Sequence, residues 1–221
     1  MTANQPTDTQ RLPRADARRN RQQLLDVARD VFVERGATAP LDLIAKRAGV
    51  GIGTLYRHFA DRETLMSAVV LDALAQSSDA GERALEEASD AFGSLTTYMH
   101  AVLDLRVAAV IPVLLEQVEL ESEELTAARE RGARALQQIV DTAHAADCLN
   151  REVTFGDIGL MLIRLSRPLP GRIAPELNAE LAHRHLDLLI NGLRPASAAP
   201  SALGGPGLSL ADLRDFAPGP D

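Results

Sequence analysis

The sequence has little cysteine, few aromatic residues and no long apolar run. Its 221 residues include one cysteine, Cys148, no tryptophan, and aromatic residues at 3%. A single cysteine excludes an intrachain disulfide, and the N-terminus lacks the charged-then-apolar pattern of a secretory leader, so we expect a reducing, cytoplasmic location. The longest apolar run, 107–115, contains a proline and is much shorter than the roughly 18 residues that span a bilayer. A membrane partner is therefore not expected.

The residues that are abundant favour helices. Apolar residues make up 46% of the chain, which is enough for a sizeable buried core. Alanine and leucine dominate, whereas β-branched residues occur only in short runs, and both preferences favour helix over strand. The composition predicts an all-α protein with one large domain or two smaller ones.

Charge is unevenly distributed along the chain, whose formal net charge is −8. Residues 1–62 contain 11 Lys and Arg against 7 Asp and Glu, a net +4, while residues 63–221 contain 12 against 24, a net −12. A basic N-terminal part joined to an acidic remainder is typical of a protein that places one end on phosphate and keeps the other end away from it.

Segment 41–65 has the pattern of a helix-turn-helix followed directly by a further helix. Gly49 stands where the first short helix would end in the left-handed conformation. In the second short helix, Leu55 and Phe59 are four residues apart and would face inward, which leaves the polar side chains between them facing outward. A helix-turn-helix presents such a polar second helix to the major groove of DNA. The segment therefore predicts a DNA-binding protein.

Helical spacing of apolar residues extends over most of the chain. Gly36 would end the first helix, Asp61 would cap the fourth, and Gly93 would separate two later ones. Helices are predicted at residues 17–35, 41–48, 53–59, 62–78, 82–91, 95–109, 112–146 with an interruption near 122, 154–166 and 176–193. The corresponding segments are a disordered arm over 1–16, a helix-turn-helix domain over 17–62, a second helical domain over 63–193 and a flexible tail over 194–221.

The order of these elements and the string IAKRAGVGIGTLYRHFADRETL resemble the TetR family of bacterial transcriptional regulators. The resemblance covers about residues 23–70. It implies an all-α homodimer with an N-terminal three-helix helix-turn-helix DNA-binding domain. It also implies that the C-terminal helical domain binds a small ligand and supplies the dimer interface. In this chain the interface would use the last two helices, about 155–166 and 176–193.

The resemblance also implies individual DNA contacts. Thr54 would face the groove, Tyr56 and His58 would donate to phosphates, and Arg62 replaces the lysine that the family often has. The expected DNA-contacting residues are Arg47, Ile52, Gly53, Thr54, Tyr56, Arg57, His58 and Arg62. Further arginines near the N-terminus would follow flanking phosphates or enter the minor groove, although a solvated arm is the simpler alternative; they are Arg14, Arg18, Arg19 and Arg21.

Two departures from the family pattern affect the expected DNA contacts. Gly51, Ile52 and Gly53 precede the outward-facing residues, whereas the family often has a hydroxyl and a lysine at the first two of these positions. Polar base contacts are not expected there, and Ile52 would instead touch a thymine methyl group. Ala39 and Pro40 replace the hydroxyl that often caps the preceding helix, so backbone amides would have to bind phosphate in its place.

Ligand contacts are harder to predict, because helical spacing does not separate a pocket from a core. Pockets combine many apolar groups with a few polar ones, and residues of both kinds are candidates in the second domain: Tyr98, Met99, His100, Leu103, Arg106, Gln117, Met161 and Arg164. Five glutamates between 116 and 124 would attract a cationic ligand, but a solvated helix face is the simpler interpretation. His183 and His185 point in different directions on a helix, so a shared metal is not expected.

We interpret the chain as a ligand-responsive transcriptional regulator, a repressor released from a palindromic operator by a small molecule. The alternative is an architectural DNA-binding protein that needs no effector. An enzyme is not expected, because the five histidines and one cysteine lack the spacing of a catalytic triad, a metal site or a phosphate loop. No cofactor is expected either.

Overall fold

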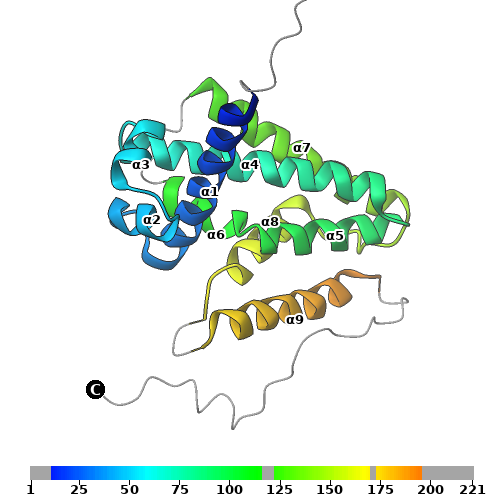
Figure 1. Cartoon of the computed structure of the whole chain (residues 1–221). Coiled ribbons are helices and arrows are strands. Elements are labelled where there is room, and N and C mark those ends of the chain that lie inside the picture. Colours follow the sequence, from blue (N-terminus) through cyan, green and yellow to red (C-terminus); the bar gives the residue numbers. More distant parts are fainter. Residues whose placement is uncertain (1–10, 116–121, 170–172, 196–221) are drawn as a thin grey trace, which may run out of the picture.

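The computed structural model describes residues 11–115, 122–169 and 173–195. All regular structure within these ranges is helical, as the composition predicted (Figure 1). The helices are α1 (Arg11–Arg35), α2 (Leu41–Arg47), α3 (Ile52–His58), α4 (Arg62–Glu87), α5 (Ala91–Asp104), α6 (Val107–Leu115), α7 (Glu123–Ala145), α8 (Phe155–Leu165) and α9 (Pro175–Leu193). We call α1–α3 the head and α4–α9 the body.

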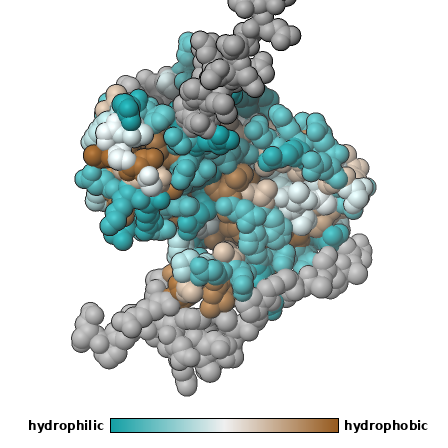
Figure 2. Space-filling view, in the orientation of Figure 1, coloured by the Kyte–Doolittle hydropathy of each residue, from teal (hydrophilic) through white to brown (hydrophobic). Residues whose placement is uncertain are grey.

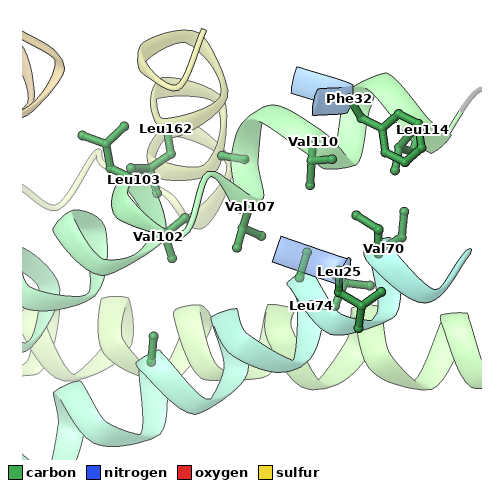
Figure 3. Close-up of a cluster of buried hydrophobic side chains, with 14 of the residues drawn as sticks. Leu25, Phe32, Val70, Leu74, Val102, Leu103, Val107, Val110, Leu114 and Leu162 are labelled. Atoms are coloured by element: carbon green, nitrogen blue, oxygen red, sulfur yellow. The ribbon is translucent and has the colours of Figure 1, made fainter. Parts of the chain in front are cut away.

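Head and body share one apolar core. Helix α1 packs on α4 and α6 as well as on α2, and α4 packs most extensively against α7. Figure 3 shows Leu25 and Phe32 of α1 among buried side chains of α4 and α6. These partners are Val70, Leu74, Val107, Val110 and Leu114. Since α1 contributes to the core of both parts, the position of the head depends on how α4 and α6 are arranged.

The boundary between α4 and α5 differs from the sequence prediction. Helix α4 is continuous over 26 residues to Glu87, where two helices were predicted. Helix α5 is capped by Asp90, whose carboxylate accepts from the amide of Gly93 at 2.7 Å. Gly93 therefore lies inside the first turn, and the predicted break at this residue was wrong. Asp90 is the stronger cap because it precedes the first apolar residue that faces the core, Phe92.

Leu105 and Arg106 connect α5 to α6, and we call this connection the corner. The sequence predicted a continuous helix through it, to residue 109. The two helices instead meet at 55°. Arg106 adopts a left-handed φ of 52°, a conformation that costs a non-glycine residue about 1 kcal/mol or more. Pro112, expected to start or kink a helix, lies inside α6.

No single helix in the described ranges is both long enough and apolar enough to cross a membrane. Helices α5 and α6 meet both criteria only when they are counted as one bent pair.

Other boundaries agree more closely with the prediction. Ser122 caps α7, which confirms the interruption there, and Thr154 forms the predicted capping box with Asp157. Helix α1 begins at Arg11, six residues before the predicted start. Arg194, the first residue of the predicted tail, stacks on the ring of Phe92 at 3.7 Å. Residues 1–10 of the predicted arm and 196–221 of the predicted tail lie outside the described ranges.

A close approach of α4 to α7 generates a first testable prediction. A Cβ added at Gly81 would lie 2.8 Å from the Cβ of Ala135, well inside normal contact. Although alanine favours a helix, we expect Gly81→Ala to lower the free energy of unfolding by about 1 kcal/mol through overpacking. Urea denaturation measures this change.

The matched control is Gly132→Ala on α7, where the nearest atom to the added Cβ is the Leu74 carbonyl oxygen at 3.9 Å. This variant should be at least as stable as the parent chain. Combining Gly81→Ala with Ala135→Gly should cost less than the sum of the two single changes, because the clash is removed. A Gly81→Ala chain as stable as Gly132→Ala would contradict the packing argument.

Candidate functional site

The turn between α2 and α3 fixes the geometry of the helix-turn-helix. Gly49 has a left-handed φ of 70°, as predicted. The amide of Val50 donates to the carbonyl of Ala45 at 3.0 Å, and the amide of Gly49 donates to that of Lys46 at 3.2 Å. These two bonds form a Schellman motif, which ends α2 and sets the direction in which α3 begins.

Helix α3 has one buried and one outward face, as the sequence predicted. Leu55 and Phe59 are 0% and 1% exposed, whereas the side chain of Tyr56 is 50% exposed and that of Arg57 is also exposed. Thr54 and His58 are partly exposed, and Thr54 accepts a hydrogen bond from the Arg57 guanidinium at 2.8 Å. The outward face therefore offers hydroxyl, phenol, imidazole and guanidinium groups on a helix held by two apolar anchors.

The first turn of α3 presents mostly backbone. Ile52 is partly buried and packs against the core, so only part of its side chain is available outside. Gly53 is exposed, and a Cβ added there or at Gly51 would meet no atom within 4 Å. The main chain can consequently be approached closely at this point, whereas few side-chain atoms project from it.

Arg47 is held in an ion pair that the sequence did not reveal. Its Nη1 lies 2.6 Å from Oε2 of Glu34 in α1, and the two side chains are 37% and 38% exposed. Pairs this exposed contribute about 0–1 kcal/mol. Glu34 therefore holds Arg47 only weakly, and a phosphate could replace this carboxylate at little cost.

Arg62 lies at the start of α4 but contacts the α1–α2 loop. Its Nη1 donates to the carbonyls of Ala37 at 2.9 Å and Ala39 at 2.7 Å. The preceding residue, Asp61, accepts from the amide of Thr64 at 2.7 Å, and this bond holds the pKa of Asp61 below its usual value. Arg62 thus supports the loop that leads into α2. Its expected phosphate contact stays a prediction, and it would have to use guanidinium N–H groups other than those on Nη1.

Of the N-terminal arginines, Arg21 stacks over the ring of Phe59 at 5.1 Å, and Arg18 is exposed. Phe59 closes the inner face of α3, so Arg21 lies beside the end of that helix. Their expected contacts with flanking phosphates stay predictions.

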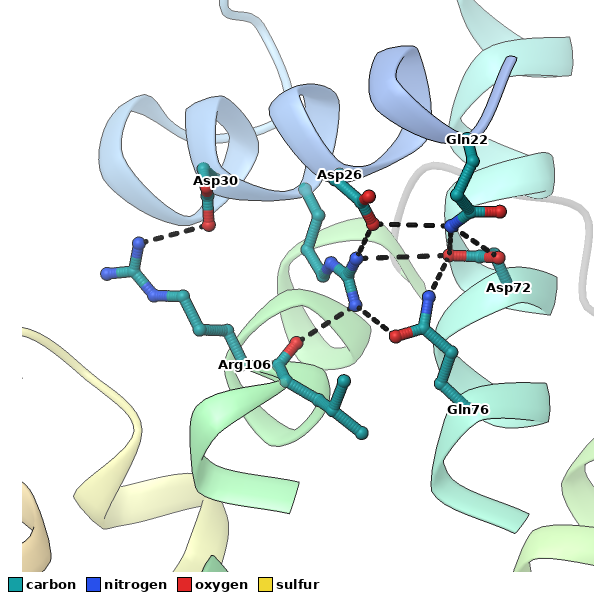
Figure 4. Close-up of polar contacts among 8 residues, drawn as sticks. Gln22, Asp26, Asp30, Asp72, Gln76 and Arg106 are labelled. Atoms are coloured by element: carbon teal, nitrogen blue, oxygen red, sulfur yellow. Dashed lines mark hydrogen bonds and ion pairs between the residues drawn. The ribbon is translucent and has the colours of Figure 1, made fainter. Parts of the chain in front are cut away.

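A buried polar network joins the head to the body (Figure 4). Arg29 of α1 is only 6% exposed, and its Nη1 donates to Gln76 of α4 and to the carbonyl of Leu105, each at 3.1 Å. Its Nη2 pairs with Asp26. One residue further along α1, Asp30 pairs with Arg106 at 3.2 Å. Two consecutive residues of α1 therefore bind the two residues of the corner.

The seven described residues among the predicted ligand contacts do not converge on one cavity. Met99 is fully buried, and Tyr98 is 4% exposed with its hydroxyl 3.0 Å from Ser77 Oγ; burial raises the pKa of Tyr98. Met161 is partly buried and packs on the core, while Arg164 is exposed. Gln117 lies outside the described residues, as do three of the five glutamates of the acidic cluster.

His100 takes part in a chain of polar contacts between α5 and α9. Its Nδ1 lies 2.7 Å from Nδ1 of His183, and the two rings stack at 5.0 Å. The outer nitrogens donate to carboxylates, His100 to Asp187 at 3.1 Å and His183 to Asp104 at 2.7 Å. Each imidazole therefore lies between a carboxylate and the other imidazole.

Leu103 and Arg106 do line a cavity, of about 540 Å³. It lies where the C-terminal end of α1, the corner, the end of α8 and the first half of α9 meet, below α1 and above α9 in the orientation of Figures 1 and 2. We call it the junction cleft, and its lining includes Asp30, Leu103, Asp104, Arg106, Leu165 and His183. Within the described ranges, no group of three or more His, Cys, Asp or Glu side chains is arranged to hold a metal ion.

Comparison with known proteins agrees with this geometry. Residues 24–69 match the family model of bacterial regulatory proteins of the tetR family. An HTH-type transcriptional regulator of Staphylococcus aureus (strain USA300) is 43% identical over 58 residues, which are 26% of this chain and 31% of that protein. The chain thus matches less than a third of the length of this curated relative.

The likeness to solved structures extends through the body. A TetR transcriptional regulator of Streptomyces coelicolor is 28% identical with a TM-score of 0.58, covering 80% of this chain and 99% of that one. A TetR transcription regulatory protein of Mycobacterium vanbaalenii is 27% identical with the same TM-score, covering 82% and 99%. Residues 24–69 therefore match the TetR family, and the rest of the chain is similar in fold to these TetR regulators. The body shares the TetR fold although the matched family model ends at residue 69.

Sequence analysis missed the contacts that join distant segments. The buried position of Arg29 had one available signal, since this residue is four positions after Leu25 and three before Phe32, on the apolar stripe of α1. No signal paired His100 with His183, which are 83 residues apart, or Arg47 with Glu34 on another helix.

The ion pair of Arg47 leads to a second prediction. Glu34→Gln removes both the partner of Arg47 and a negative charge close to the expected DNA surface. We expect binding to a duplex oligonucleotide to strengthen about threefold to fivefold at low salt, and the gain to shrink as salt screens the charges. Fluorescence anisotropy at two salt concentrations measures it.

The control for this prediction is Glu130→Gln, an exposed glutamate on α7 that is also paired with an arginine. It should leave DNA binding unchanged. The gain should also vanish in an Arg47→Ala background, and an equal gain there would show that the effect is general charge rather than release of Arg47.

Proposed function

We propose that this chain is a DNA-binding transcriptional repressor that a small molecule releases from a palindromic operator. The observation that carries the proposal is the outward face of α3, where Tyr56 is 50% exposed while Leu55 and Phe59 on the inner face are buried. A helix-turn-helix uses such a face in the major groove. The basic charge of residues 1–62, net +4, favours the same end of the molecule.

On this proposal, α3 lies in the groove and its side chains contact mainly phosphates. Tyr56, Arg57 and His58 donate hydrogen bonds to phosphates of the DNA backbone. Thr54 and the exposed part of Ile52 face the bases. The Gly53 backbone lies close to the DNA because no Cβ separates them. Arg47 exchanges Glu34 for a phosphate, and Arg62 contributes through its remaining donors.

A homodimer would place two heads on one operator. Large apolar side chains are exposed on the two last helices: Leu160 of α8 is 60% exposed, and Leu188 and Leu189 of α9 are 48% and 37% exposed. Figure 2 shows apolar surface on α9, which packs on the rest of the body chiefly through α5 and α8. A second copy that covers this face would remove these side chains from water, which stabilises association.

The proposed division of labour assigns one role to each part of the chain. The head, residues up to 62, would bind DNA, and the body, from residue 63 to 193, would bind the effector and pair with the second copy. A ligand that favours one arrangement of α6 and α4 would shift the head, since α1 packs on both. Release requires only that the ligand bind the DNA-free arrangement more tightly.

A double variant tests the docking of α3. Changing Tyr56→Ala together with His58→Ala removes two phosphate donors from exposed positions, so the fold should be retained. We expect about 2 kcal/mol of lost binding free energy, roughly a thirtyfold weaker complex at moderate salt. The measurement is a binding titration on the region upstream of the chain's own reading frame, with DNase footprinting to locate the operator.

Arg134→Ala, a surface truncation on α7, is the matched control and should bind as the parent chain does. Unchanged operator affinity in the double variant would refute this docking. Footprinting also separates the proposal from its alternative, since protection without sequence preference would indicate an architectural protein.

The dimer has its own test. Replacing Leu160→Glu and Leu188→Glu adds two charges to the exposed apolar face of α8 and α9. We expect the chain to sediment as a monomer at micromolar concentration while its helical content stays unchanged. Ala145→Glu, at an exposed position on α7, is the control and should remain a dimer. A parent chain that is monomeric would contradict the proposal, as would a dimeric double variant.

A further inference from the structure

The junction cleft has a wall that suits the apolar part of a small organic molecule. Leu103 and Leu165 line it from helices α5 and α8, and Leu169 and Ile173 line it from the connection between α8 and α9. Its volume of about 540 Å³ falls in the range of small-molecule pockets. Leu169 is 45% exposed although it is a large apolar side chain, and a ligand placed here would cover it.

The charged groups of the cleft are predominantly acidic. Asp30, Glu34 and Asp104 contribute three carboxylates, against the guanidinium of Arg106 and the imidazole of His183. Even with His183 charged, this lining has a net charge of −1. The sequence beyond residue 62 has a net charge of −12, so the surroundings add to the negative potential.

Each of these carboxylates has a partner but also retains capacity. Asp30 pairs with Arg106 at 3.2 Å, Glu34 with Arg47 at 2.6 Å, and Asp104 with His183 at 2.7 Å. Their side chains are 51%, 38% and 66% exposed. A carboxylate accepts about four hydrogen bonds, so each can take a further donor without losing its present partner. The three carboxylates would attract an added cation. They would repel an added anion, and the guanidinium of Arg106 is already paired with Asp30.

We propose that the junction cleft binds an amphipathic organic cation, with an ammonium group between Asp30 and Asp104 and an apolar body against Leu103, Leu165 and Leu169. The proposal rests on the proposed function only in making this ligand the effector. Asp30 belongs to the head and Asp104 to the body, so the ammonium bridges the two parts. Its binding energy therefore depends on their relative position, which is the condition for coupling to DNA binding.

The experiment compares three naphthalene probes whose single polar substituent is cationic, neutral or anionic. They are 1-naphthylmethylammonium, the neutral 1-naphthylmethanol and the anionic 1-naphthoate, titrated calorimetrically into the full chain without DNA. We expect the ammonium probe to bind once per chain, at least tenfold more tightly than the naphthoate and several-fold more tightly than the alcohol. Equal or tighter binding of the naphthoate would overturn the proposal, and so would no measurable binding of the ammonium probe at millimolar concentration.

Variants locate the bound cation. Asp30→Asn and Asp104→Asn should each weaken binding of the ammonium probe about threefold to fivefold, and together more than tenfold, with the alcohol unaffected. Asp141→Asn on α7, an exposed aspartate outside the cleft, makes the same chemical change and should have no effect. Equal losses in all three single variants, or no loss in the first two, would show that the cation binds elsewhere.

These measurements do not depend on the proposed function, because DNA is absent. If the ammonium probe binds as expected but the chain protects no operator, the ligand inference stands and the repressor proposal fails. If an operator is protected but the naphthoate binds best, the repressor proposal stands and the ligand class is wrong.

Discussion

Arg29 carries a positive charge into the contact between α1, α4 and the corner, where it is only 6% exposed. A charge at such a position is tolerated only with close partners, and removing one partner of a buried pair costs about 3–5 kcal/mol. Here Asp26, Gln76 and the carbonyl of Leu105 are those partners. The carbonyl is available because the corner interrupts the helix at this residue. The bend between α5 and α6 and the burial of Arg29 therefore depend on each other.

Because of this dependence, only a few contacts separate the two candidate sites, which are the outward face of the helix-turn-helix and the junction cleft. The corner's other residue, Arg106, has the left-handed backbone and also binds Asp30 in the junction cleft. The strain at Arg106 is offset only while its neighbours hold it, so the corner is a place where a modest change in contacts can alter the backbone. A ligand near Asp30 would act on the same two turns of α1 that Arg29 anchors. Residues 26–34 thus lie on one helix, which connects the polar network, the cleft and, through Arg47, the surface proposed to bind DNA.

What could be predicted from the sequence was mostly local. Gly49 demanded a left-handed turn, and the spacing of Leu55 and Phe59 gave the orientation of α3, because both depend on residues within one or two helical turns. The α4–α5 boundary was predicted wrongly, because no local signal showed that α4 continues past residue 78. At Gly81 the missing Cβ lets α7 pack closely against this continuation. Nothing local marked the corner. Its conformation is set by Arg29, which is 76 residues away from the carbonyl it binds.

The first turn of α3 limits how this protein would distinguish one DNA sequence from another. Gly51 and Gly53 offer no side chains, and Ile52 divides its surface between core and solvent. Thr54 and a few apolar atoms are therefore the groups left for direct base contacts. These are few contacts for recognition of a typical operator. The side chains around them that are expected to bind phosphates are more numerous and include charged groups. If the chain binds DNA as the proposed dimer, its specificity would come from the spacing of the two heads. It would also come from how readily the DNA adopts the shape that brings phosphates to Tyr56 and His58, since deformability differs between sequences even at base pairs that no side chain touches.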